Sequence, residues 1–205
     1  MRTRTVVALG LGAVLGGLAG YELSWRGACL NWGATAEEAG GEVAGDLFLP
    51  RAPLVSTRAV TVAAPPGKIW PWLVQMGPGR GGAYTYDWIE NLFGLDMHSA
   101  DAVLPQFQDL REGDVLPMGA SGPRMRVGIL DAERALVLCS EDGAWVWAFA
   151  LRPQGAVTRL VSRNRIVPPS SWGARAFYRY VMEPGSLVME RKMLLGIKRR
   201  AESLG

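Results

Sequence analysis

Between residues 124 and 167 the chain holds four apolar segments that are joined by links of only three to five residues. This spacing constrains the fold more than any other feature, because a parallel return within a sheet needs about a dozen residues or more. The four segments must therefore pair as consecutive antiparallel strands joined by hairpins. They cover residues 124–130, 134–140, 144–151 and 157–167.

The segments before and after this meander complete the expected fold. Residues 56–65 alternate, with Val60 and Val62 on one face, which predicts a further strand. Apolar residues at helical spacing predict a short helix at 65–76 and a second one at 86–93. The apolar side of the second helix is expected to be Trp88, Ile89, Leu92 and Phe93. Residues 186–204 predict a long amphipathic helix, which completes an α+β domain with helices on one face of a curved antiparallel sheet.

Residues 1–24 are predicted to be a membrane anchor. Residues 5–21 carry no charge, and about 20 apolar residues suffice to cross a bilayer. A cleaved signal peptide is the alternative, because Gly17 and Ala19 supply small residues before a cut. Trp25 favours the uncleaved anchor, since tryptophan is typical of the membrane interface.

The anchor determines the expected location of the rest of the chain. Arg2 and Arg4 at the N-terminus favour a cytoplasmic start, so we expect a single-pass protein of the cell membrane with an extracytoplasmic domain. Residues 25–53 are rich in Ala, Gly, Glu and Pro and are interpreted as a linker. Residues 54–205 are then the folded domain.

Composition and charge narrow the function classes. The formal net charge is only +3, and no basic run is interleaved with aromatic residues, so nucleic-acid binding is not expected. His98 is the only histidine, and Cys29 and Cys139 lie far apart, so neither a metal site nor another cofactor is expected. A Cys29–Cys139 disulfide stays open, although the context "ALVLC" favours a buried strand position for Cys139.

Several segments resemble the helix-grip superfamily known as SRPBCC, which includes START-type lipid-binding domains and polyketide cyclase/dehydrase-like proteins. They are "WGAT" (32–35), "WPWLVQMGPGRGGAYTYDWIENLFGLDMHSAD" (70–101), "LREGD" (110–114) and "EPGSLVMERKMLLGIKRRAE" (183–202). The chain is most similar to a membrane-anchored branch of unknown function. The resemblance implies a curved sheet wrapped around the C-terminal helix, with a tunnel between them, and it implies no catalytic set.

The strand faces predict where such a cavity lies. In 144–151, Ala148 and Ala150 share a face with Val146 and leave room, whereas the opposite face carries large aromatic residues. In 157–167 the alternating arginines are expected in solvent, so Ser162 and Asn164 point inward. Their buried polar groups then need a ligand, a water molecule or the Tyr86 hydroxyl as partner.

The glycine-rich stretch "QMGPGRGGAYTYDWIENLFG" (75–94) admits two interpretations. It is a connector between the two short helices, in which Arg80 pairs with Asp87 and the tyrosines cap the cavity rim. Alternatively, its polar side chains contact a ligand at the mouth of the grip, namely Gln75, Arg80, Tyr84, Tyr86 and Asp87. A phosphate-binding loop is a weaker interpretation, because the preceding strand and the lysine are missing.

Charged residues elsewhere have simpler interpretations. His98 with nearby aspartates could act as a general base, which would join Tyr86 and Asp87 in an enzyme of cyclase or dehydratase type. Glu183 and Glu190 are interpreted as helix-end residues that favour the dipole. The basic set Lys198, Arg199 and Arg200 is expected to be a solvated helix end.

The sequence therefore predicts membrane-anchored binding of a hydrophobic small molecule or lipid in an internal cavity. The expected ligand-contacting residues are Gln75, Arg80, Tyr84, Tyr86, Asp87, His98, Ser162 and Asn164. A cyclase or dehydratase acting on a polyketide-like or isoprenoid-like substrate is the alternative. An interaction module whose own side chains fill the cavity is the third class.

Overall fold

A six-stranded antiparallel sheet forms the body of the protein. The computed structural model describes residues 16–17, 20–92, 94–119 and 122–203. The strands lie in the order β1-β6-β5-β4-β3-β2, so the last strand in sequence pairs with the first. The meander predicted from the short links is confirmed. The strands are β1 (Leu54–Val62), β2 (Val115–Pro117), β3 (Arg124–Asp131), β4 (Ala135–Ser140), β5 (Trp145–Gln154) and β6 (Val157–Ile166).

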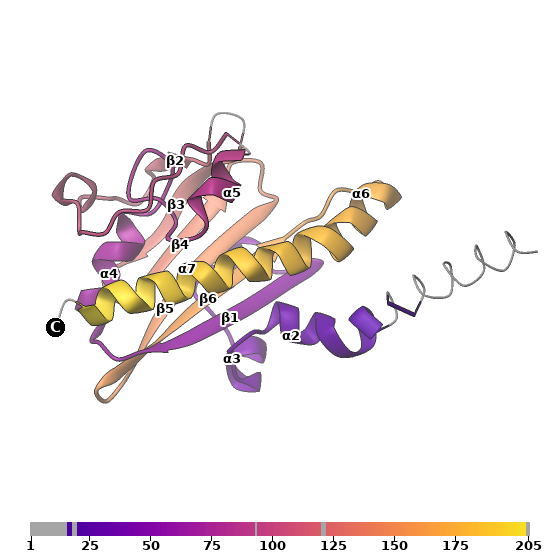
Figure 1. The fold of residues 1–205 in the computed structure, drawn as a ribbon, viewed down its shortest axis with the longest axis horizontal. Helices are drawn as coiled ribbons and strands as arrows, with labels where there is room; N and C mark the ends of the chain where they lie inside the picture. Colours follow the sequence, from indigo (N-terminus) through magenta and orange to yellow (C-terminus); the bar gives the residue numbers. More distant parts are fainter. Residues whose placement is uncertain (1–15, 18–19, 93, 120–121, 204–205) are drawn as a thin grey trace, which may run out of the picture.

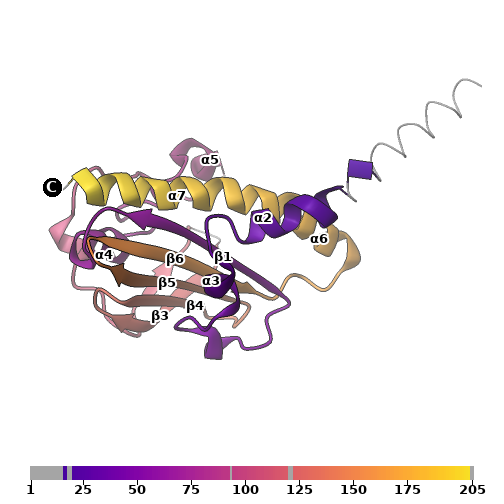
Figure 2. The same cartoon turned by 90° about the horizontal axis from the view of Figure 1, so that it is seen from below.

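One long helix, α7 (Glu183–Ser203), lies across the concave face of this sheet (Figures 1 and 2). Two short helices follow the first strand as expected, α4 (Pro66–Val74) and α5 (Asp87–Leu92). This arrangement is the α+β helix grip that the sequence predicted. The remaining helical segments are η1 (Tyr21–Trp25), α2 (Arg26–Leu30), α3 (Ala36–Gly40), η2 (Asp46–Phe48), η3 (Pro105–Phe107), α6 (Trp172–Phe177) and η4 (Tyr178–Met182).

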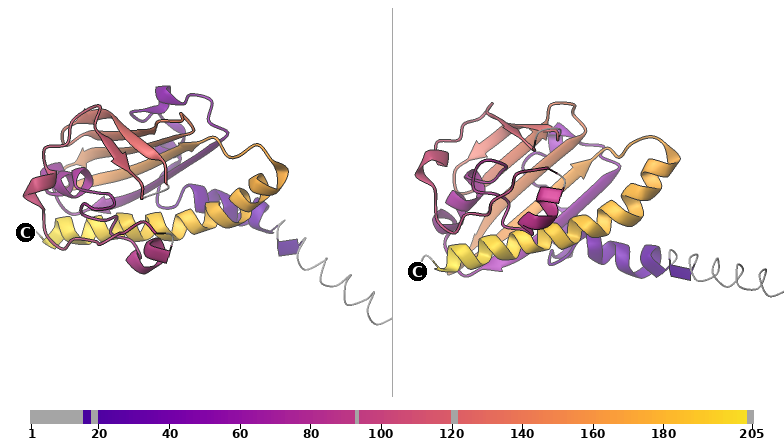
Figure 3. Two further views of the ribbon diagram at one scale, coloured as in Figure 1. Left: turned by 90° about the horizontal axis from the view of Figure 1, so that it is seen from above. Right: turned by 45° about the horizontal axis from the view of Figure 1, so that its top comes forward.

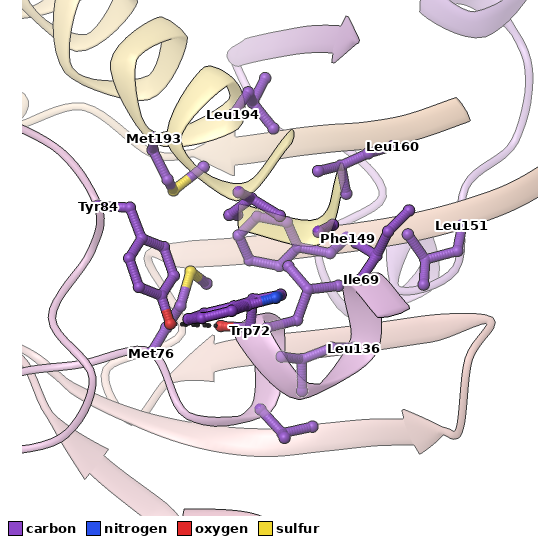
Figure 4. Close-up of a cluster of buried hydrophobic side chains, with 14 of the residues drawn as sticks. Ile69, Trp72, Met76, Tyr84, Leu136, Phe149, Leu151, Leu160, Met193 and Leu194 are labelled. Atoms are coloured by element: carbon purple, nitrogen blue, oxygen red, sulfur yellow. Dashed lines mark hydrogen bonds between the residues drawn. The ribbon is translucent and has the colours of Figure 1, made fainter. Parts of the chain in front are cut away.

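The main core fills the space between the sheet and one end of α7. Figure 4 shows Trp72 of α4 packed between the Tyr84 ring and side chains of the sheet. The Trp72 and Tyr84 rings meet edge to face at 5.8 Å, and the Tyr84 hydroxyl donates to the Trp72 carbonyl at 3.0 Å. Side chains therefore close this end of the grip. The other fully buried members include Ile69, Leu136, Phe149, Leu160, Met193 and Leu194.

A second, smaller core lies on the convex face of the sheet. Val146 and Ala148 of β5 pack there with Val43, from the segment that precedes β1. Figure 3 shows this segment on the side of the sheet opposite α7. The small residues of β5 therefore make room for the chain's own residues 33–50, and the face predicted to border a cavity does not border one. The segment expected to be a linker is packed against the sheet.

Three arginines of β6 fasten this segment, so the prediction that they face solvent was wrong. Arg163 is 2% exposed and donates to Asp46 at 2.7 Å and to Thr57 at 2.9 Å. Arg159 pairs with Glu38 of α3 at 2.7 Å, and Arg165 pairs with Asp46 at 3.2 Å. The physical reason is that carboxylates and carbonyl oxygens of the preceding segment satisfy the buried guanidinium groups.

Helix α5 is rotated relative to its predicted orientation. Trp88 and Leu92, expected on its apolar side, are 67% and 76% exposed, whereas Glu90 is 8% exposed. Phe93 lies outside the described residues. Polar contacts determine this orientation: Asp87 accepts from the Ser99 backbone at 2.8 Å, and Asn91 donates to the Met97 carbonyl at 3.0 Å.

The predicted anchor falls mainly outside the described residues, which begin at 16–17 and continue from 20. Within the described ranges, no helix has both the length and the apolar character that a bilayer crossing requires. The two cysteines are separate free thiols, with Cys29 in α2 and Cys139 in β4.

Candidate functional site

A cavity of about 340 Å³ lies between the concave face of the sheet, α7 and the segment around α5. Its walls are mainly apolar. Trp145 and Trp147 of β5 face it, so the aromatic side of this strand borders the space and not the small-residue side. Six methionines line it as well: Met76, Met97, Met118, Met182, Met189 and Met193. The chain's own side chains thus close one end of the grip and leave an apolar cavity beside it.

A buried ion pair forms part of the cavity wall. Arg58 of β1 is fully buried, and its guanidinium donates to the Glu190 carboxylate of α7. The same guanidinium donates to the Cys29 carbonyl at 3.0 Å and to the Ser186 hydroxyl at 2.9 Å. Antiparallel pairing sets Arg58 opposite Ser162 of β6, which brings the charge beneath α7. The pair therefore joins the first strand to the last helix.

Side chains of β5 and β6 complete this polar network. The Trp145 indole donates to Asn164 at 2.8 Å, and the Trp147 indole donates to Ser162 at 3.0 Å. Both Ser162 and Asn164 donate in turn to Glu190. The prediction that these two residues point inward is confirmed. Glu190 and the indoles satisfy them, in place of the ligand, water molecule or Tyr86 hydroxyl that was expected.

The α5 side of the cavity carries polar atoms without a protein partner. Glu90 Oε2 and Thr85 Oγ1 are both inaccessible to solvent, and neither makes a hydrogen bond to any described residue. Both residues line the cavity. Burial is the largest influence and raises the pKa of the Glu90 carboxyl, the nearby Thr85 side chain lowers it, and the Asp87 carboxylate raises it. This side of the cavity therefore holds polar atoms whose hydrogen-bonding capacity is not used by ordinary protein partners.

The stretch 75–94 forms part of the cavity wall, although not through the residues predicted. Gln75 is fully buried and braces the following loop, accepting from Leu104 at 2.8 Å and donating to Ala102 at 3.2 Å. Arg80 donates to the carbonyls of Val74 and Phe107 and lies over the Phe107 ring, so the predicted Arg80–Asp87 pair is not formed. The residues of this stretch that line the cavity are Met76, Gly77, Ala83, Thr85 and Glu90.

The tyrosines of this stretch have separate environments. Tyr84 is 1% exposed and has a left-handed backbone, with φ of 59°. Its ring lies 4.7 Å from the guanidinium of Arg200, and burial raises the pKa of its hydroxyl. Arg200 is itself buried and pairs with Asp101, so the expectation of a solvated position was wrong for this residue. Tyr86 is 36% exposed and lies beneath the Lys192 ammonium.

The predicted acid–base set is not assembled at the cavity. The His98 side chain is 78% exposed and pairs with Asp96 at 3.1 Å. Asp87 is occupied by Ser99, whose hydroxyl donates to it at 2.6 Å. Of the eight residues predicted to contact a ligand, Asn164 lines the cavity; Gln75, Arg80, Tyr84, Tyr86, Asp87, His98 and Ser162 do not.

The sequence contained signals for two site residues that the prediction missed. Arg58 shares its strand face with Val60 and Val62, so the alternation already places it inward. Glu190 lies four residues before Leu194 on the apolar stripe of α7, which predicts burial and excludes a helix-end role. Glu183 does begin α7, where it accepts from Arg26 at 2.7 Å. Glu90 had no comparable signal, because the orientation of α5 is not visible in its pattern.

Among known proteins, the chain is similar only at low sequence identity to the solved structures given below. No protein-family model and no curated protein matches the chain. The KanY protein is a similar solved structure, with 14% identity and a TM-score of 0.48 over 73% of this chain and 97% of that chain. A protein from Rhodobacter sphaeroides gives 14% identity and a TM-score of 0.49 over 74% of this chain and 93% of that chain.

The Polyketide_cyc-like protein Cgl2372 from Corynebacterium glutamicum is also similar. It shares 16% identity with a TM-score of 0.41, over 76% of this chain and 95% of that chain. At these identities and TM-scores the likenesses carry no information on ligand or activity.

Proposed function

We propose that the cavity binds a hydrophobic small molecule or lipid without covalent chemistry. The observation that carries this proposal is an apolar space of about 340 Å³, lined by tryptophan and methionine, inside an otherwise well-packed grip. This volume lies at the lower end of the range for small-molecule sites, roughly 300–1,000 Å³. An apolar ligand replaces the van der Waals contacts that the empty space forgoes.

The methionine side chains that line the cavity can adapt to the shape of a ligand. Six of the chain's eight methionines line the cavity. Methionine side chains are unbranched and polarizable, so they adjust to irregular apolar surfaces. The polar groups on the Arg58–Glu190 side are already paired with one another, which makes that side a fixed boundary. Tyr86, His98 and Asp87 do not line the cavity, so the proposal remains binding and does not extend to cyclase or dehydratase chemistry.

We further propose that the N-terminal segment holds the domain at a membrane. Tyr21 of η1 packs on Tyr180 with ring centroids 5.8 Å apart, and Glu22 pairs with Arg179 of η4. The α2 residue Arg26 adds its pair with Glu183. These contacts fasten the end of the apolar run beside η4, whose Tyr178 and Met182 line the cavity.

Exposed apolar side chains on η1 and α6 support the proposal that this end of the domain lies at a membrane. Leu23 and Trp25 of η1 are 87% and 59% exposed, and Trp172 and Phe177 of α6 are 86% and 56% exposed. Tryptophan favours the bilayer interface, and unpartnered apolar side chains lose contact with water there. A ligand could then pass between the bilayer and the cavity through the η4 end.

The test of binding compares two tryptophan substitutions on neighbouring residues of α7. Met189→Trp adds volume inside the cavity, whereas Val188→Trp adds it at a side chain that is 52% exposed. Extracted lipid and other small molecules are quantified by mass spectrometry after purification of the full chain. We expect Met189→Trp to retain at least tenfold less of the dominant compound than the wild type, with Val188→Trp unchanged. Equal retention by both variants would exclude the cavity as the binding site.

A further inference from the structure

The charged groups of the cavity wall are unevenly matched. Its charged residues are Arg58 and three glutamates, Glu90, Glu183 and Glu190. Arg58 pairs with Glu190, and Glu183 is matched from outside the cavity by Arg26. Among the described residues, no cation pairs with Glu90. The cavity therefore has one carboxyl group more than its cations can balance.

Glu90 also lacks ordinary hydrogen-bond partners. Its Oε2 atom is buried, the residue is 8% exposed, and no described group donates to or accepts from that oxygen. Thr85 Oγ1, five residues earlier, is also buried and makes no hydrogen bond of ordinary distance and angle, although the Thr85 side chain lies close enough to Glu90 to lower the pKa of its carboxyl. Buried polar atoms in native proteins are rarely left unpaired, so two of them on one cavity wall indicate a site for a polar group of the ligand.

The surroundings of Glu90 shift its balance toward the neutral acid. Burial is the largest influence and disfavours the carboxylate, the Thr85 side chain favours it, and Asp87 on the same helix adds a like charge. On α7, Glu190 is neutralised by Arg58, and the ammonium of Lys192 lies over the Tyr86 ring. The neutral acid has one O–H to donate, and Thr85 offers a hydroxyl that both donates and accepts.

We propose that Glu90 and Thr85 bind the hydroxyl or carbonyl group of a neutral hydrophobic ligand, and that the cavity discriminates against carboxylates. The inference rests on the proposed function, because it specifies the ligand class of the same cavity. A fatty-acid carboxylate would meet Glu90 without a free cation nearby, since the Arg58 guanidinium is already bound by Glu190, Ser186 and the Cys29 carbonyl. A neutral alcohol or ketone can use both unpartnered atoms.

The experiment is a competition among three ligands that share one alkyl chain. The full chain is incubated at neutral pH with equal amounts of 1-dodecanol, dodecanoate and dodecylammonium, and the bound ligands are quantified by mass spectrometry after rapid gel filtration. Met189→Trp gives the background that does not depend on the cavity. We expect the wild type to retain dodecanol over dodecanoate by at least tenfold, with dodecylammonium close to background.

Variants at Glu90 and Thr85 test whether these two residues cause the preference for dodecanol. Glu90→Leu should lower dodecanol retention at least fivefold, because no donor replaces the carboxyl group. Glu90→Gln should keep the preference for dodecanol over dodecanoate, because its amide is an uncharged donor like the neutral acid. Glu37→Gln, at an exposed position of α3, is the matched control and should leave the preference unaltered. If Glu90→Leu does not fold, Thr85→Val provides the corresponding loss of a hydroxyl at constant shape.

The outcomes distinguish a failure of the proposed binding function from a failure of the proposed ligand class or of its contacting residues. Retention equal to that of Met189→Trp for all three ligands would contradict the proposed binding function itself. Retention that depends on the cavity but favours dodecanoate would overturn the assignment of a neutral ligand. Preferential retention of dodecylammonium that Glu90→Gln abolishes would show a cation site at an ionised Glu90, which also overturns it. Unchanged dodecanol retention in both Glu90→Leu and Thr85→Val would remove these residues from the site.

Discussion

At the scale of single residues, the ion pair between Arg58 and Glu190 connects β1, the first strand, to α7, the last helix. Both residues are at least nine-tenths buried. Removing one partner leaves an uncompensated charge in an apolar interior, which costs about 3–5 kcal/mol, whereas replacing both with apolar residues is often neutral. The pair therefore specifies how β1 meets α7 more than it adds to net stability.

A double-mutant comparison tests this view of the pair. Arg58→Met alone should lower the free energy of unfolding by about 3–5 kcal/mol because it leaves Glu190 unpaired. Combining it with Glu190→Leu should recover most of that loss, as measured by chemical denaturation. Additive losses in the double variant would mean that each residue stabilises the fold through its other contacts, such as those to Ser186 and Asn164.

Glu90 predicts a dependence of stability on pH with a defined sign. Burial raises its pKa above the ordinary value of 4.5, so the folded chain holds a proton that the unfolded chain releases as pH rises past that value. Stability therefore falls with rising pH until the raised pKa is passed, and below 4.5 this loss is absent because both states are protonated.

Glu90→Gln has no proton to release and should escape this loss. Its melting temperature relative to the wild type should rise between about pH 4 and pH 7.5 in thermal melts. Glu37→Gln, whose side chain is exposed, controls for the change in net charge and should show a constant difference. A constant difference for Glu90→Gln as well would contradict a raised pKa at this site.

At the scale of secondary-structure elements, length explains which features could be predicted from sequence. The 21 residues of α7 and the 10 residues each of β5 and β6 repeat their pattern often enough to establish a period. Helix α5 has six residues, fewer than two turns, so its apolar residues do not determine which side is buried. Its contacts with residues 97–99 do so instead, and such contacts between distant segments leave no local pattern.

The segment before β1 was missed for a related reason. Its small and acidic residues resemble a linker, and its packing becomes intelligible only when β6 is placed beside it. Arg163 shows this best, because it donates to the carbonyls of Glu38, Ala39 and Gly41 in addition to Asp46. The arginine alternation of β6 was visible in the sequence, but the partners that bury it lie more than 100 residues earlier.

Arg163→Met should accordingly release the segment from the sheet. Losing a buried guanidinium that binds a carboxylate and three carbonyl groups should cost about 3–5 kcal/mol in unfolding free energy. Arg124→Met is the matched control, because Arg124 is 61% exposed and pairs with Glu141 at the surface, where pairs contribute about 0–1 kcal/mol. Hydrogen exchange should show faster exchange in residues 36–48 of the Arg163 variant. Protection equal to the wild type would refute this role.

At the scale of the whole molecule, the sheet separates two hydrophobic cores that are filled to different extents. The convex side is filled by residues of the preceding segment, and the concave side is filled by α4 and α7 only at one end. Residues of η4, α2 and the first half of α7 line the cavity. Figures 1 and 3 show α2 beside the end of α7 that α6 precedes. Ligand binding at that end therefore need not disturb either core, which lets a binding site coexist with a stable fold.

Two truncations test how much of the N-terminal region belongs to the fold. Removing residues 1–24 deletes the Tyr21–Tyr180 and Glu22–Arg179 contacts but keeps the Arg26–Glu183 pair and the whole convex-side core. We expect this chain to unfold cooperatively, with a stability within about 2 kcal/mol of the full chain, because surface ion pairs and one aromatic pair contribute at that level.

Removing residues 1–53 should have a much larger effect. It uncovers the convex-side core around Val146 and Ala148 and deprives Arg163 of its partners in the removed segment, which leaves a buried cation next to exposed apolar surface. Uncovered apolar surface of this kind promotes association, so we expect this chain to aggregate or to lose its cooperative melt. The measurement is circular dichroism with size-exclusion chromatography on both truncations. A monomeric chain 54–205 that melts like chain 25–205 would return residues 25–53 to the role of a linker.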